Sequence, residues 1–288
     1  MKTFKIGGVH PHDSKISKDC AIEDFPVLEK AYLSMAQHLG APAEPIVQKG
    51  DKVKVGQLIA KPTGFVSANI HSSVSGTVAA VEPYADLAGN PVMHVIIDVE
   101  GDEWEESIDR TPDVVRDITL SKEEIIKRIQ DCGIVGLGGA SFPTHIKLTP
   151  PPGKVAEYLL INGAECEPFL TSDYRLMIEQ PEQVLIGAKI MMKALDVKKC
   201  RFGVEENKPE AIAKLKSFSA QYPEIEIVPL KKKYPQGGEK QLIEALTGRR
   251  VPSMGLPIDA GAVVQNCGTA LAVYEAVQKN KPLFEGIV

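Results

Sequence analysis

Four glycines between positions 133 and 139 are the first feature of this 288-residue sequence that could bind a ligand. Gly133, Gly136, Gly138 and Gly139 permit positive φ angles and carry no Cβ, so the backbone N–H groups around them can turn toward an anion. The loop therefore predicts a phosphate cradle, and the alternative is a tight connector beside closely packed backbone. The loop follows no predicted strand and does not spell G-x-G-x-x-G, so the general dinucleotide fingerprint does not apply.

A second group of polar residues follows a short apolar run at Leu159–Ile161. Three consecutive apolar residues predict a buried strand. Asn162, Glu165 and Glu167 come directly after it, where an α/β sheet opens into its ligand crevice. Cys166 lies between two carboxylates without a neighbouring histidine, which predicts an inert, packed thiol.

The elements that would position these residues alternate along the second half of the chain. Ser121 and Glu124 match a capping box, and the helix that they begin is expected to end at Gly133. This alternation predicts a largely parallel sheet covered by helices. The predicted strands cover 157–161, 200–204, 225–230 and 262–264, and the predicted helices cover 181–195, 208–221, 238–247 and 269–280.

The first half is expected to be rich in strands. Short β-prone runs separated by glycine and proline turns occur at 45–47, 52–55, 58–60, 76–81 and 93–99. Before them, the spacing of apolar residues from Leu28 to Leu39 predicts a helix that serves as an interface element. Two domains are predicted, 1–118 and 119–288, joined by an acidic, proline-bearing linker at 101–118.

Composition excludes several classes of protein. A net charge of −5 argues against binding to nucleic acid, and the Lys231–Lys233 run is predicted to be a solvated loop. No apolar stretch approaches the length of a membrane span, and the N-terminus lacks a signal peptide. Five dispersed cysteines predict reduced thiols without a cluster, and His10 and His12 predict a hydrogen-bonded turn rather than a metal site.

Four segments together resemble a known family. They are the glycine loop with its following lysine, 162–168 (NGAECEP), 234–239 (YPQGGE) and 263–269 (VVQNCGT), with the opening 4–11 (FKIGGVHP) as further support. In this order they are similar to the flavin- and NADH-binding subunit of respiratory complex I. The similarity is greater to RnfC, the peripheral subunit of the Rnf electron-transport complex.

The strand-rich half resembles a second pattern, the biotinyl/lipoyl-like barrel-sandwich-hybrid, or hammerhead, fold. The resemblance lies in residues 50–58 and 72–78. The position of the modified lysine is Phe65 here, and Lys61 lies four residues too early. The resemblance implies a hammerhead domain without a carrier function, followed by a Rossmann-like FMN-binding domain in an α/β arrangement.

The resemblance also implies residue roles. Phe142 and Glu167 match positions that contact NADH, whereas Ala164 and Gly238 depart from the family pattern of acids. Lys147 and the glycine loop match the positions that approach the FMN phosphate. The positions expected to bind FMN are Gly136, Gly138, Gly139, Lys147, Asn162, Glu165, Tyr234, Gly237, Gly238, Glu239, Gln265, Asn266 and Thr269.

The function implied is that of a subunit of an ion-translocating ferredoxin:NAD+ oxidoreductase complex, which binds FMN and NAD(H) and transfers a hydride between them. Electrons would continue through 4Fe-4S clusters of a ferredoxin-like C-terminal region that this sequence does not contain, so we expect a truncated chain. The implied partners are NADH and the other Rnf subunits. The implied location is the cytoplasmic face of the inner membrane, bound peripherally. The alternative is a non-catalytic scaffold that docks the membrane partners of a quinone-reductase-type complex.

Overall fold

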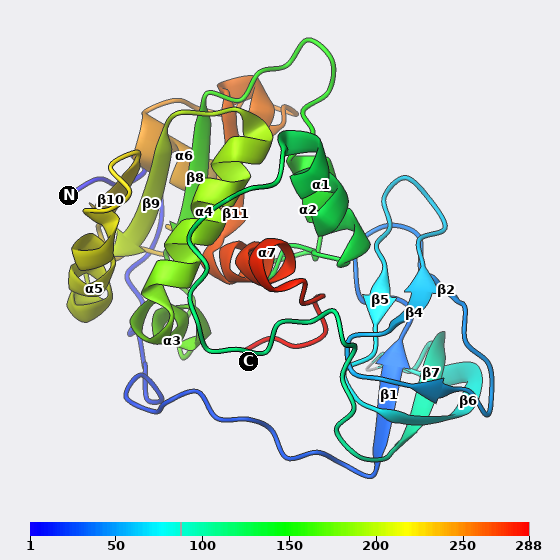
Figure 1. Ribbon diagram of the computed structural model, residues 1–288. Helices are drawn as coiled ribbons and strands as arrows, with labels where there is room; N and C mark the ends of the chain where they lie inside the picture. The colour runs from blue at the N-terminus through cyan, green and yellow to red at the C-terminus, as the bar shows by residue number, and fades with distance from the viewer. Residues whose placement is uncertain (87, 288) are drawn as a thin grey trace.

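A four-stranded parallel sheet forms the centre of the C-terminal half of the computed structural model, which describes residues 1–86 and 88–287 (Figure 1). The strand order is β10-β9-β8-β11, and all three pairings are parallel. This confirms the predicted α/β arrangement. The strands are β8 (Tyr158–Gly163), β9 (Cys200–Glu205), β10 (Ile225–Leu230) and β11 (Ala262–Asn266).

Helices cover both faces of this sheet. Leu159 and Ile161 of β8 pack into the larger apolar cluster, and Leu160 packs into the smaller one beneath α6. Both faces of the strand are therefore buried, which explains its uninterrupted apolar run. The helices of the larger cluster are α1 (Lys122–Asp131), α3 (Ser172–Glu179), α4 (Pro181–Leu195), α5 (Pro209–Ser219) and α7 (Cys267–Lys279); α6 (Glu239–Thr247) and the 3₁₀ turn η1 (Pro257–Ala260) lie with the smaller one.

The first half folds as two small antiparallel sheets around one core, which confirms the predicted hammerhead. Their strand orders are β1-β7-β6-β3 and β2-β4-β5. Ile59, Val78 and Ile97 are among the buried residues between them. The strands are β1 (Lys30–Ser34), β2 (Glu44–Pro45), β3 (Lys52–Val53), β4 (Leu58–Lys61), β5 (Ile70–His71), β6 (Gly76–Ala85) and β7 (Pro91–Val99).

The helix predicted over residues 28–39 is wrong, because β1 occupies this segment. Its residues pair antiparallel with β7, with Leu33 opposite Val95. Within β1, Lys30 and Tyr32 are exposed whereas Ala31 and Leu33 are half-buried, so the side chains follow the two-residue period of a strand. The helical spacing in the sequence did not reveal this, since long-range pairing with β7 determines the structure of the segment.

The linker at 101–118 packs against the α/β domain. Arg116 binds the buried carboxylate of Glu182 through two hydrogen bonds of 2.7 and 2.9 Å. Lys279 Nζ lies 2.7 Å from Asp109 Oδ2. Val114 and Ile118 pack on the larger apolar cluster. These contacts fix the path of the chain between the two domains, whose assigned boundaries stay a prediction.

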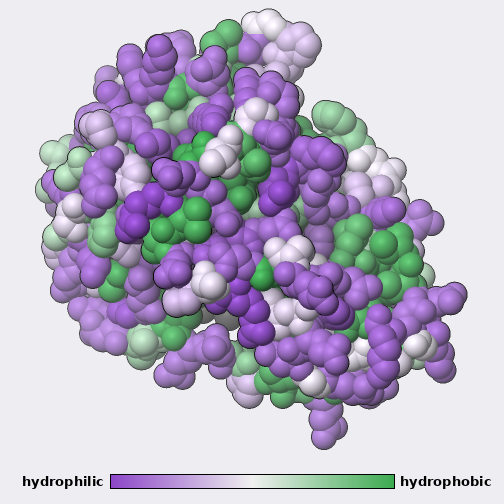
Figure 2. Space-filling view, viewed as in Figure 1, coloured by the Kyte–Doolittle hydropathy of each residue, from purple (hydrophilic) through white to green (hydrophobic). Residues whose placement is uncertain are grey.

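The visible surface is mostly hydrophilic, with apolar patches that include one over the hammerhead domain (Figure 2). Among residues 1–86 and 88–287, no helix is long and apolar enough to cross a membrane. The capping box at Ser121 is present, as the sequence predicts. Two helices were not predicted, α3 and the single turn α2 (Thr144–Lys147).

Candidate functional site

The glycine loop follows α1 and lies against the start of α7. Of its four glycines only Gly133 uses a positive φ, of +64°. A Cβ on Gly133 would meet the carbonyl oxygen of Asn69 at 2.3 Å. Asn69 belongs to the hammerhead domain, so this glycine permits close contact between the domains.

The later glycines have different surroundings. The Gly136 N–H donates to Phe142 O at 2.9 Å, and the Leu137 N–H donates to Thr269 Oγ1 at 2.9 Å. A Cβ on Gly138 would come within 2.8 Å of Asn266 Cβ, whereas one on Gly139 would meet no atom within 4 Å. Gly138 therefore permits close packing on α7, and the exposed Gly139 leaves room for a ligand on the open side of the loop.

Asn266 connects the loop to the rest of the site. It is the N-cap of α7, and its Oδ1 accepts hydrogen bonds from the N–H groups of Gly268 and Thr269. Its Nδ2 donates to Asp173 Oδ2 at 2.7 Å. The glycine loop, α7 and α3 thus meet at one side chain.

Lys147 ends the short helix α2 and points toward the carboxyl end of β11. Its Nζ lies 2.7 Å from Glu239 Oε1, and it donates to Val264 O at 3.0 Å. The side chain is 33% exposed. Next to Val264, Gln265 is buried and its Nε2 has no hydrogen-bond partner among the described residues. A cation from α2 and an amide donor from β11 therefore lie together at the end of β11.

The polar segment that begins in the last residues of β8 contacts the loop before α6. Asn162 Nδ2 donates to Gly237 O at 2.8 Å, and Asn162 Oδ1 accepts from Ala164 N–H at 3.1 Å. A Cβ on Gly237 would lie only 2.2 Å from Ala164 O. The Ala164 side chain packs in the apolar cluster beneath α6. Burial raises the pKa of the Cys166 thiol, in keeping with the predicted inert thiol.

Glu165 is buried and faces α3. Its Oε1 accepts from the Asp173 N–H at 2.9 Å, while its Oε2 has no hydrogen-bond partner in the described part of the chain. Burial, with the nearby charge of Glu165, raises the pKa of Asp173 to about 6. Sequence reasoning missed Asp173 because it missed α3, for which the Ser172-Asp173 pair after Thr171 offered only a weak start signal.

Other predicted residues lie at the rim. Glu167 is exposed, Tyr234 is 37% exposed, and Phe142 is half-buried behind the glycine loop. Gly238 is the N-cap of α6. Neither the Glu167 carboxylate nor the Tyr234 hydroxyl makes a hydrogen bond to another predicted site residue among the described residues, so the roles assigned to these four positions stay predictions.

The N-terminal motif contacts the loop before α6. His10 Nδ1 lies 3.2 Å from Lys232 O, and no cluster of His, Cys, Asp or Glu able to hold a metal occurs within residues 1–86 and 88–287. The prediction that the lysine run is only solvated is wrong for two of its residues. Lys232 Nζ binds Asp13 Oδ1 at 2.9 Å, and Lys233 Nζ lies 4.0 Å from the centre of the Phe4 ring. The reason is that the first residues of the chain cover this loop.

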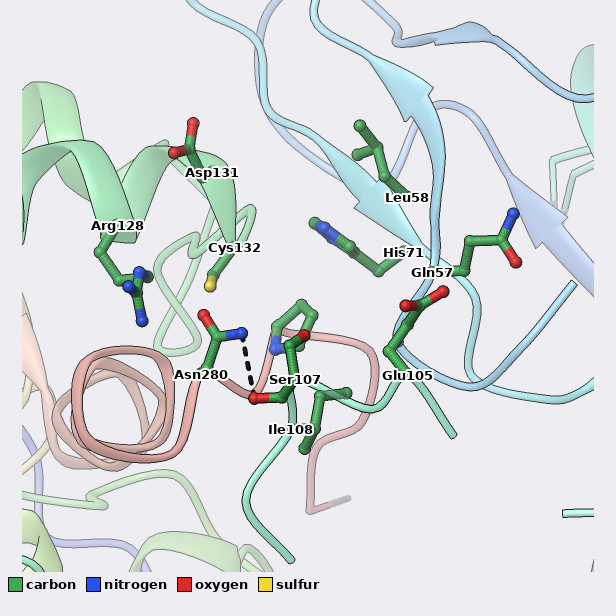
Figure 3. Close-up of a pocket in the computed structure, with 12 residues that line it drawn as sticks. Gln57, Leu58, His71, Glu105, Ser107, Ile108, Arg128, Asp131, Cys132 and Asn280 are labelled. Atoms are coloured by element: carbon green, nitrogen blue, oxygen red, sulfur yellow. Dashed lines mark hydrogen bonds between the residues drawn. The ribbon is translucent and has the colours of Figure 1, made fainter. Parts of the chain in front are cut away.

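A cavity lies elsewhere, at the junction of the two domains (Figure 3). Its volume is about 360 Å³. His71 of the hammerhead and Arg128, Cys132 and Asn280 of the α/β domain line it, and Asn280 Nδ2 donates to Ser107 O. None of the residues predicted to bind FMN lines this cavity. The candidate site is instead an open surface at the carboxyl end of the sheet.

Comparison with known proteins matches the two halves of the chain to two family descriptions. Residues 129–275 match the family description "Nuo51 FMN-binding domain", and residues 2–102 match "RnfC Barrel sandwich hybrid domain". Together these matches define the class: a flavin-binding α/β domain preceded by a barrel-sandwich hybrid.

Sequence identity to individual relatives identifies the family within this class. The chain is 47% identical, over 100% of its length, to a subunit of the proton-translocating ferredoxin:NAD(+) oxidoreductase complex of Clostridium ljungdahlii. It is 44% identical over 98% of its length to the counterpart from the Na(+)-translocating complex of Acetobacterium woodii, and 41% identical over 100% to the counterpart from the ion-translocating oxidoreductase complex of Pseudomonas aeruginosa. It covers 62%, 63% and 37% of these relatives. The chain belongs to the RnfC family.

Proposed function

We propose that this chain binds FMN at the carboxyl end of its parallel sheet and is an electron-transfer subunit of an Rnf-type oxidoreductase complex. The observation that carries the proposal is the convergence of predicted residues from separate elements. Lys147 meets Glu239, Asn162 meets Gly237, and the glycine loop meets Asn266 and Thr269. This convergence lies in the segment that matches an FMN-binding domain.

The surroundings of this site suit a flavin phosphate. Gly139 offers exposed backbone with no neighbour where a side chain would be, and Lys147 supplies a partly exposed ammonium. Backbone N–H groups and an ammonium are the donors that bind phosphate. The buried Nε2 of Gln265 and Oε2 of Glu165 have no hydrogen-bond partner among the described residues, and they are a donor and an acceptor for the polar edge of a ring system. We therefore assign FMN to this surface.

We further propose that NADH is the partner of the bound flavin, with Glu167 and Phe142 as its contacts at the rim. When bound, FMN accepts a hydride and can pass electrons on singly, so the protein residues need only position the two molecules. Glu167 is exposed and directly precedes Pro168, which restricts the backbone there. Its carboxylate is accessible for orienting a dinucleotide.

The proposal that this chain is part of a larger complex rests on the names of its relatives. Their names describe subunits of ion-translocating complexes that connect ferredoxin and NAD(+). We propose that this chain joins the other Rnf subunits peripherally at the cytoplasmic face of the membrane. Its electrons would be relayed through 4Fe-4S centres outside the present sequence.

Titration with FMN, and in parallel with riboflavin, tests the proposal. We expect the protein to quench the fluorescence of FMN in a saturable way. Riboflavin, which lacks the phosphate, should bind much more weakly. Adding NADH anaerobically to the FMN-loaded protein should bleach the flavin absorption. Equal affinity for the two flavins would refute the phosphate site. Bound FMN that NADH never bleaches would refute the nicotinamide role and favour a non-catalytic scaffold.

A further inference from the structure

The first residues of the chain form an arm, residues 2–22, that lies along the α/β domain before the chain enters the hammerhead. In Figure 1 this dark-blue segment passes β10 and β9 and continues below α3 toward β1. Lys2 pairs with Leu230, and Val9 exchanges two backbone hydrogen bonds of 2.8 Å with Tyr234. Farther along, the Ile22 N–H donates to Glu179 Oε1 at 3.0 Å.

Lys15 is the residue of this arm with the most unusual surroundings. Its Nζ donates to the carbonyl oxygens of Glu165, Glu167 and Leu170 at 3.0, 2.8 and 2.6 Å. An ammonium has three N–H donors, so one loop uses them all. The side chain is only 12% exposed, and Nζ lies 3.9 Å from Glu165 Oε2. Burial of this charge lowers the pKa of Lys15.

The loop that Lys15 binds, residues 164–171, needs such support. Phe169 has a φ of +71°, a conformation that residues other than glycine rarely adopt. Such a conformation persists only where the surrounding structure imposes it. Here the Phe169 N–H donates to Asp13 O at 3.0 Å, and Thr171 Oγ1 lies 2.7 Å from Ser17 Oγ. The arm, and not a neighbouring strand, supplies these contacts.

Asp13 anchors the arm on its other side. Its carboxylate accepts from Lys232 Nζ and Asn207 Nδ2, both at 2.9 Å. These bonds hold the pKa of Asp13 well below its usual range, so the carboxylate stays charged. Lys208 reinforces the arrangement, since its buried ammonium donates to Glu165 O at 3.2 Å. The arm thus connects the loop of Glu165 and Glu167 with the loop of Tyr234 and Gly237.

We propose that Lys15 is a positioning residue for the dinucleotide side of the site. By turning three carbonyl groups of residues 165–170 inward, its ammonium fixes the backbone from which the Glu167 side chain extends outward. Lys15 itself touches neither FMN nor NADH in this role. The inference rests on the proposed function, because it assigns Lys15 a purpose only where Glu167 orients NADH.

The test compares Lys15→Met with Lys18→Met in the 288-residue chain. Lys18 lies on the same arm, but its side chain is 53% exposed and its Nζ only reaches Asp19 at 4.0 Å. Hydrogen–deuterium exchange of the cofactor-free proteins should show faster uptake in residues 164–171 for Lys15→Met alone. The FMN dissociation constant should change less than the reduction rate does, because the phosphate donors assigned to Gly139 and Lys147 lie outside residues 164–171. NADH should reduce the bound flavin at least about tenfold more slowly, since misplacement of an orienting group is costly.

Two results overturn the inference: unchanged exchange in residues 164–171, or faster exchange with an unchanged reduction rate per bound flavin. If Lys15→Met does not fold, Lys15→Arg replaces it. Arginine keeps the charge, but its planar fork cannot direct donors to three converging carbonyls, so the same two losses are expected in weaker form. Failure of the proposed function looks different, because NADH would then reduce neither wild type nor variant. In that case the exchange measurement alone decides whether Lys15 holds the loop.

Discussion

The Nζ of Lys147 lies 2.7 Å from Oε1 of Glu239 and joins the helix after the glycine loop to the first residue of α6. The same ammonium donates to Val264 O at the end of β11. Both partners hold the cation in place at the carboxyl end of the sheet while leaving it one-third exposed. A phosphate bound there would share an ammonium that is already oriented.

The first prediction concerns that ammonium. Lys147→Ala should weaken FMN binding about tenfold. A hydrogen bond to a charged group contributes roughly 1.5–3 kcal/mol, and the lower end of this range applies because Glu239 already neutralises part of the charge of Lys147. Quenching of flavin fluorescence measures it. Lys154→Ala is the matched control, because Lys154 forms an ion pair of the same length, 2.7 Å, with Asp259 away from the predicted site residues. Indistinguishable titration curves for the two variants would remove Lys147 from the site.

The second prediction separates two adjacent glycines. Gly138→Ala would push a methyl group against Asn266 and should lower stability by about 1–3 kcal/mol. Gly139→Ala meets nothing within 4 Å, so stability should be nearly unchanged while FMN binding weakens. Chemical denaturation and flavin titration of both variants measure these effects. Unchanged FMN affinity in Gly139→Ala would show that the loop is only a close-packed connector.

The sequence predicted the four strands and the five longest helices of the α/β domain, because these elements carry local signals, whereas α2 and α3 were missed. The bounds predicted for the helix at 181–195 coincide with α4, where Pro181 at the start and Asp196 in a left-handed conformation at the end delimit the helix. The strands followed from apolar runs buried on both faces. In the hammerhead, β1 was mistaken for a helix because its pairing with β7 spans more than sixty positions and leaves no local signal.

For the candidate site, the motifs predicted which residues converge but not why each is needed. Gly133 was assigned to the phosphate cradle together with its neighbours, yet it serves the contact with Asn69. That role depends on a partner from the other domain, which no local pattern reveals. Lys15 was not predicted for the same reason, since its carbonyl partners lie about 150 positions away. Polar contacts between distant segments therefore required the structure.

The third prediction concerns Glu167. Its backbone is held by Lys15, whereas its side chain is exposed, so Glu167→Gln should preserve the loop and FMN affinity. Reduction of the bound flavin by NADH should slow at least about tenfold if the carboxylate orients the dinucleotide. Anaerobic stopped-flow bleaching measures the rate per bound flavin. A glutamate that merely supports the fold would instead lower thermal stability and leave the rate intact.

The last prediction concerns His71, which lines the cavity between the domains. The ring is buried, its Nδ1 has no hydrogen-bond partner among the described residues, and burial lowers the pKa of His71 to about 4. The usual value is 6.5, so between these two pH values the unfolded chain binds more protons than the folded one. The contribution of the neutral ring is therefore complete above pH 6.5 and is lost as the pH falls toward 4.

Because the unfolded chain takes up this proton, the free energy of unfolding of the wild type should fall by about 2 kcal/mol between pH 7 and pH 5. The His71→Leu variant lacks the imidazole and should not show this loss. Urea denaturation of both proteins at the two pH values measures the difference. Asp173, whose raised pKa of about 6 makes stability fall as the pH rises over the same range, is present in both proteins and cancels in this comparison. Substituting the exposed His12 with Gln should leave the wild-type pH dependence in place. If His71→Leu loses as much stability as the wild type at pH 5, then the imidazole is not desolvated at the junction, and water or another group must reach it there.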